Sequence, residues 1–138
     1  DLSHPNMGYD WHGTGNWFQP EKTDSGKDYW PQSDLQLMEQ SIPDYMDSEP
    51  FHTYYMTVSG HMLYDVSGNQ MAYRNYDAVA DLPYSETTKG YLACQLELEK
   101  GMKLLVSELE ERGIADHTMI VLGADHIPYN DKPVCDET

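Results

Sequence analysis

The clearest hydrophobic pattern lies between residues 86 and 112, where apolar side chains recur at spacings of three and four. The members of this stripe are Tyr91, Cys94, Leu98, Met102, Leu105 and Leu109. Such spacing places them on one face of a helix, and Gly113 follows as a natural C-terminal cap. The sequence therefore predicts a helix from about Glu86 to Arg112.

Acidic residues alternate with this apolar stripe. They are Glu97, Glu99, Glu108, Glu110 and Glu111, with the basic residues Lys100, Lys103 and Arg112 interspersed among them. Oppositely charged side chains three or four positions apart pair on exposed helix faces. We therefore predict that the acidic side of this helix is solvated, in preference to a metal cluster.

Two shorter runs have the composition of buried strands. Residues 51–59 are dense in aromatic and β-branched side chains between Pro50 and Gly60, and residues 118–123 are almost continuously apolar. A strand, a long helix and a second strand in this order predict a βαβ unit with parallel pairing and a right-handed crossover. The predicted fold class is α/β, with a parallel βαβ core and long loops.

The N-terminal quarter is less regular. Residues 1–32 are rich in Gly, Asn, Asp, Trp and Pro and show no sustained period, so they are predicted to form an irregular loop region. Ser33 is followed three residues later by Gln36, as an N-cap with its capping-box partner, and predicts a short helix ending near Pro43. We expect residues 1–138 to form one domain or part of one, with residues 33–138 as its α/β core part.

The chain is strongly acidic, with 24 Asp and Glu residues against 8 Lys and Arg, and its formal net charge is −16. This charge opposes binding to nucleic acid or to an anionic membrane surface. No run approaches the roughly 20 apolar residues of a membrane-spanning helix. Because the sequence begins without Met and stops within a polar run, we expect an internal piece of a larger domain.

Polar residues that could carry chemistry follow both predicted strands: His61 after the first, and Asp125 and His126 after the second. Active sites of parallel α/β sheets form where the carboxyl ends of strands meet their loops. A carboxylate beside an imidazole suits manganese, zinc or iron better than calcium, and an imidazole can also contact a phosphate or protonate a leaving group. On spacing alone, a capping aspartate and solvated histidines are the ordinary interpretation.

Longer stretches around these residues carry a more specific signal. Residues 50–61, 91–100 and 113–126 together resemble lipoteichoic acid synthase-like proteins of the sulfatase and alkaline phosphatase superfamily, and residues 4–10 look like the stretch after the substrate-binding loop of such enzymes. The resemblance implies a partial three-layer αβα domain. It also implies that Asp125 and His126 bind a divalent metal, usually manganese, and that His61 contacts the phosphate of the substrate.

The same resemblance implies an activity. A nucleophile attacks phosphorus or sulfur, and an acceptor hydroxyl or water resolves the covalent intermediate. Residues 1–138 match neither the family's threonine nucleophile nor the formylglycine site of sulfatases, so we expect this chain to be inactive alone. The implied substrates are a glycerophospholipid head group with a glycolipid polymer as acceptor, or a phosphate or sulfate ester. The implied location is the extracytoplasmic face of a bacterial plasma membrane.

Two further expectations complete the sequence-based picture. Exposed sheet edges would favour self-association of such a piece. A different class also stays open: a non-catalytic binding module for acidic glycans or glycolipids, which would use a bound cation and the 11 Tyr and 3 Trp residues. The same aromatic residues serve equally well in an ordinary amphipathic interior.

Overall fold

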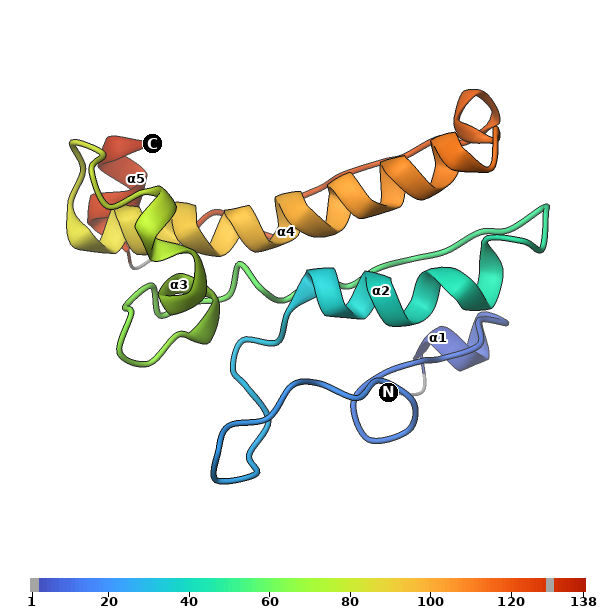
Figure 1. The fold of residues 1–138 in the computed structure, drawn as a ribbon, viewed down its shortest axis with the longest axis horizontal. Helices are drawn as coiled ribbons and strands as arrows, with labels where there is room; N and C mark the ends of the chain where they lie inside the picture. The colour runs from blue at the N-terminus through green and yellow to red at the C-terminus, as the bar shows by residue number, and fades with distance from the viewer. Residues whose placement is uncertain (1–2, 129–130) are drawn as a thin grey trace.

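The computed structural model describes residues 3–128 and 131–138 and is organised around one long helix, α4 (Glu86–Glu111) (Figure 1). Helix α2 (Asp34–Tyr45) runs beside the C-terminal half of α4 in the same direction, and α3 (Gln70–Asn75) and α5 (Lys132–Glu137) lie at its N-terminal half. The remaining elements are α1 (Ser3–Asn6) and the short 3-10 helices η1 (Tyr76–Ala78) and η2 (Ala115–His117).

The predicted α/β fold class is wrong, because the described part of the chain is all-α and contains no sheet. Its strand-type pairings are two isolated bridges, Thr14 with Phe18 and Lys22 with Asp28. Residues 51–58 and 118–124 belong to no helix and pair with no strand in the described residues. A helix satisfies its own backbone groups, whereas a strand needs a second strand to do so. The parallel βαβ core and the partial three-layer αβα architecture are therefore both contradicted.

The two strand-like segments nevertheless share a direction. Figure 1 shows residues 51–58 and residues 118–124 each running back along α4, opposite to the course of the helix. In the first segment Phe51 and Tyr55 pack against the helices, whereas Tyr54 and Met56 are 59% and 60% exposed. The loops that follow both segments therefore lie toward the N-terminal half of α4.

Two hydrophobic clusters hold the helices together along α4. One joins α2 to the C-terminal half of α4 and consists of Met38, Ile42, Met46, Leu105 and Leu109. The other joins α3, α5 and a loop residue to the N-terminal half and consists of Tyr64, Met71, Ala72, Cys94 and Val134. Burial of these side chains is the main favourable contribution to folding. The second cluster includes Tyr64, which lies in the loop that carries His61.

The predicted helix ends are largely confirmed. The Ser33 hydroxyl accepts the backbone N–H of Gln36 at 3.1 Å, although α2 continues through Pro43 to Tyr45. Helix α4 ends in a Schellman arrangement: the N–H groups of Gly113 and Ile114 donate to the carbonyls of Glu110 and Leu109, both at 3.0 Å. Gly113 has φ +71°, a left-handed conformation that glycine adopts without strain.

Candidate functional site

Asp125 and His126 lie side by side on the surface at the end of the second extended segment. Nε2 of His126 is 3.6 Å from Oδ2 of Asp125, and the two side chains are 49% and 89% exposed respectively. Nδ1 of His126 lies 2.7 Å from the carbonyl oxygen of Ile127. A carbonyl only accepts, so Nδ1 carries the proton and a neutral ring keeps its lone pair on Nε2. A metal-binding histidine is commonly oriented in this way.

His61 is held at the surface by its neighbours. Its Nδ1 donates to the carbonyl of Met62 at 2.6 Å, and its ring meets Trp30 edge-on with centroids 5.1 Å apart. The amide of Asn69 donates to the carbonyls of His61 and Leu63 at 3.0 and 2.8 Å, which fixes this loop. Beside it is a pocket of about 240 Å³ lined by Trp30, Pro31, Met62, Leu63, Asp65, Gly68 and Asn69.

Tyr64 lies in the loop that carries His61. Its hydroxyl donates to the carbonyl of Gly60 at 3.2 Å. Burial, together with the nearby Tyr91, Cys94 and acidic groups that include Asp125, raises the pKa of Tyr64 to about 12. The structure describes no hydrogen bond or ion pair that joins His61 directly to Asp125.

The side chains of Asp125 and His126 are of the types that bind transition metals, but two ligands are too few to complete a coordination shell. One carboxylate and one imidazole are ligands that manganese and zinc accept. Across residues 3–128 and 131–138, no group of three or more His, Cys, Asp or Glu side chains is placed to hold a metal ion. Two protein ligands leave most of a coordination shell to water or to other groups, so we expect binding to be weak.

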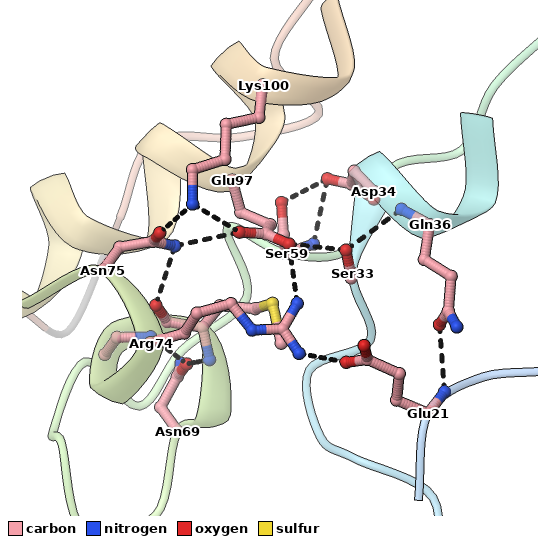
Figure 2. A network of polar contacts seen from close by, with 12 residues as sticks. Glu21, Ser33, Asp34, Gln36, Ser59, Asn69, Arg74, Asn75, Glu97 and Lys100 are labelled. Atoms are coloured by element: carbon pink, nitrogen blue, oxygen red, sulfur yellow. Dashed lines mark hydrogen bonds and ion pairs between the residues drawn. The ribbon is translucent and has the colours of Figure 1, made fainter. Parts of the chain in front are cut away.

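The most highly connected polar cluster surrounds Glu97 in the middle of α4, and sequence reasoning missed it (Figure 2). Glu97 is fully buried. Its carboxylate accepts hydrogen bonds from Ser33 at 2.5 Å, from Asn75 at 3.0 Å and from Arg74 at 3.0 Å, and Lys100 lies 3.5 Å away. This Glu97 network therefore joins the start of α2 and the end of α3 to α4.

The prediction of a solvated acidic face is consequently wrong for Glu97, although Glu99, Glu110 and Glu111 are exposed. The sequence did contain a signal for this burial. Glu97 is three residues after Cys94 and four before Gly101, so it falls on the same helix face as these small residues. A face of small side chains allows a neighbouring helix to approach closely, and a charge on such a face is buried with it.

Arg74 also belongs to this network. Besides Glu97, its guanidinium donates to Glu21 in the N-terminal loop region. Burial favours loss of the proton, but the hydrogen bond and the charges of the two glutamates outweigh it and raise the pKa of Arg74. Arg74 is therefore an ion-pair residue that links the end of α3 to α4 and to the N-terminal loop region.

Asp34, the first residue of α2, anchors the segment that leads to His61. Its carboxylate accepts the backbone N–H groups of Val58 and Ser59 at 2.8 and 3.1 Å, and also the Ser59 hydroxyl. Burial raises the pKa of Asp34 in spite of these hydrogen bonds, and the charge of Glu97 adds to the effect. Asp34 thus fixes the end of the first extended segment two residues before His61.

The Glu97 network predicts a specific dependence of stability on pH. Burial alone would raise the pKa of Glu97, but hydrogen bonds from Ser33 and Asn75 and the charges of Arg74 and Lys100 hold it below its ordinary 4.5. A depressed carboxyl pKa stabilises the fold above 4.5, and this stability is lost as the pH falls through the lower folded value. Asp34 has a raised pKa, so its contribution to the stability of the fold decreases as the pH rises.

We expect Glu97→Gln to weaken the fall in the free energy of unfolding between about pH 5 and about pH 3. Urea unfolding followed by helical circular dichroism at several pH values measures this slope. Glu99→Gln, at an exposed position two residues away, is the control and should keep the wild-type slope. Equal slopes for Glu97→Gln and wild type would show that Glu97 does not titrate differently on folding.

Comparison with protein-family models, with curated proteins and with solved structures found no match to this chain. Within the described residues, none of the helices has the length and apolar character needed to cross a membrane.

Proposed function

We propose that this chain supplies part of the site of an extracytoplasmic, metal-dependent phosphoglycerol transferase or sulfatase. In this proposal Asp125 and His126 are metal ligands and His61 contacts the phosphate or sulfate group of the substrate. The proposed substrates are a glycerophospholipid head group and a glycolipid polymer, or another phosphate or sulfate ester. The nucleophile and the remaining ligands would come from polypeptide outside residues 1–138.

The arrangement of the Asp125–His126 pair is the observation that carries the proposal. The two side chains are exposed and lie 3.6 Å apart, and the hydrogen bond from Nδ1 to Ile127 orients the imidazole with Nε2 toward Asp125. A divalent metal bound here would polarise the phosphate or sulfate oxygens of a substrate. The chain's own residues would hold and orient that ion and would leave coordination positions open for the ester.

His61 has a separate proposed role. With Nδ1 donating to Met62, the proton-exchanging atom is Nε2, which can donate a hydrogen bond to a phosphate oxygen or protonate a leaving alkoxide. Trp30 packs against the ring, and Asn69 fixes the backbone on which the ring is mounted. These contacts limit the orientations of the imidazole, which a positioned acid or hydrogen-bond donor requires.

Manganese binding tests the proposal directly. We expect purified protein to bind Mn²⁺ weakly, with a dissociation constant on the order of 0.1–1 mM, because two ligands leave the shell incomplete. Loss of the free Mn²⁺ signal in electron paramagnetic resonance measures the binding. An excess of Mg²⁺ suppresses non-specific attraction to a chain of net charge −16. Asp125→Asn and His126→Ala should each weaken the remaining binding at least about fivefold.

The chain contains its own matched control for this experiment, since Asp116 and His117 are a second adjacent Asp–His pair. They lie in η2, before the second extended segment rather than after it. Asp116→Asn and His117→Ala remove the same charges and should leave Mn²⁺ binding unchanged. If both pairs of variants weaken binding equally, the ion is attracted by charge alone and the assignment of Asp125 and His126 is wrong.

A second candidate function, a glycan-binding module, is favoured by a group of stacked rings at the surface. The rings of His4 and Trp11 have centroids 5.2 Å apart, and those of His4 and Tyr54 lie 5.6 Å apart. Aromatic faces are suitable platforms for sugars. A change in tryptophan fluorescence on addition of a glycerophosphate glycan, retained in Asp125→Asn and lost in Trp11→Ala, would favour this candidate over the metal-dependent one.

A further inference from the structure

The second extended segment exposes an unusual run of apolar side chains. Consecutive residues Met119, Ile120, Val121 and Leu122 are 86%, 41%, 81% and 70% exposed. The structure also describes no backbone–backbone hydrogen bond to residues 119–127 from the rest of the described chain. An extended, apolar segment with unpaired backbone groups is a template for a further strand.

We propose that this segment, residues 118–124, pairs antiparallel with the same residues of a second copy of the chain, around a two-fold axis at Val121. In this register Val121 faces its own copy, and Ile120 and Leu122 face each other across the axis. The pairing satisfies backbone groups of both copies and brings Ile120, Val121 and Leu122 of the two copies into contact. It does not rest on the proposed function, because it needs neither a metal nor a substrate.

The charged residues at the two ends of the segment favour a second copy of the chain as the partner and favour the antiparallel orientation. Antiparallel pairing of residues 118–124 centred on Val121 brings His117, the last residue of η2, next to Asp125 of the other copy. The Asp125 carboxylate then lies beside an imidazole, whereas parallel in-register pairing would set Asp125 against Asp125 of the other copy. Opposite charges at facing strand positions stabilise a pair and like charges destabilise it. The two-fold arrangement also closes on itself as a dimer.

The net charge sets the conditions under which the dimer forms. Two copies of net charge −16 repel each other, and this repulsion is screened by salt while the apolar contact is not. One pair of short strands is also smaller than a standard protein–protein interface. We therefore expect a weak dimer, with a dissociation constant on the order of 10–100 µM, that tightens severalfold between about 50 mM and about 500 mM NaCl.

Sedimentation equilibrium over a wide concentration range tests the dimer. Val121→Lys places two like charges together at the axis and should weaken dimerisation at least tenfold. Val106→Lys changes the net charge identically at an exposed apolar position of α4 and should leave the dissociation constant within about twofold of wild type. A wild-type chain that stays monomeric at all concentrations and salt levels would overturn the proposal, as would equal effects of the two variants.

Disulfide cross-linking tests the register. In a Cys135→Ser background, which removes the exposed thiol, Val121→Cys should cross-link with its own copy under mild oxidation. Met119→Cys should cross-link poorly, because residue 119 faces Gly123 of the other copy. Equal cross-linking of both variants would indicate parallel pairing and contradict the proposal. Protection of the 119–123 amides from hydrogen exchange in a monomer would mean that the chain's own residues cover the segment, which also overturns it.

Discussion

Replacement of Glu97 by alanine is expected to reduce the free energy of unfolding by about 3 kcal/mol, the lower end of the range for a buried ion pair, because Arg74 and Lys100 are partly exposed. The carboxylate is fully buried and accepts hydrogen bonds from Ser33, Arg74 and Asn75. Its removal takes the acceptor away from the Ser33 hydroxyl and from one N–H of Asn75, both buried, whereas Arg74 keeps Glu21. Urea unfolding monitored by the helical signal at neutral pH measures the loss.

Glu99→Ala is the matched control, because it deletes the same side chain from the same helix at an exposed position. Its effect should be within about 0.5 kcal/mol of zero. A comparison of Glu97→Gln with Glu97→Ala separates charge from hydrogen bonding, since the amide keeps one acceptor oxygen. A loss for Glu97→Ala as small as that for Glu99→Ala would mean that the network does not hold α2, α3 and α4 together.

The helices were the predictable part of this fold, because their evidence is local. The apolar stripe from Tyr91 to Leu109 and the glycine at 113 define α4 within two residues, and Ser33 with Gln36 marks the start of α2. A helix satisfies its hydrogen bonds within the same stretch of chain that carries the pattern. The end of α2 was misplaced, since Pro43 lies within the last turn instead of ending the helix before it, and the short helices α1, α3 and α5 were not predicted.

Whether strands pair into a sheet was not predictable from the same kind of local evidence. Residues 51–59 and 118–123 have strand composition, but a strand forms only when another strand accepts its hydrogen bonds. Pairing depends on segments distant in sequence, and composition does not reveal whether a partner strand is present. In the described structure α2 and α4 pack against Phe51 and Tyr55 instead, and the apolar residues 119–122 remain exposed.

In the candidate site, too, local features were predictable from the sequence and contacts between distant segments were not. The adjacency of Asp125 and His126 is a property of the sequence, and the structure adds the orientation of the imidazole through Ile127. The structure describes no hydrogen bond or ion pair between this pair and His61, so the grouping of the three residues stays a prediction. The burial of Glu97 was predictable in principle from its position between Cys94 and Gly101. Its partners Ser33 and Asn75 were not, because they lie on other elements.

Substitution of Gly90 by alanine is the second change expected to have a large effect. A Cβ atom at this position would lie 2.0 Å from the carbonyl oxygen of Tyr64 and 2.9 Å from its carbonyl carbon. Both are backbone atoms, so a side-chain rotation cannot relieve the overlap, and α4 must separate from the loop. Over-packing of this kind costs about 1–3 kcal/mol or more, against a helix-propensity gain of about 1 kcal/mol. We expect a net loss of about 2 kcal/mol in urea unfolding.

Two other glycines calibrate this measurement. A Cβ at Gly101 would lie 3.0 Å from the flexible sulfur of Met38, and a Cβ at Gly123 would meet no atom within 4 Å. The expected order of destabilisation is therefore Gly90→Ala, then Gly101→Ala, then Gly123→Ala, the last within about 0.5 kcal/mol of wild type. Stabilisation by Gly90→Ala would contradict the close contact between α4 and the Tyr64 carbonyl. Since Tyr64 contacts Gly60 beside His61, that contact also fixes how the proposed phosphate-binding loop is held on the helix.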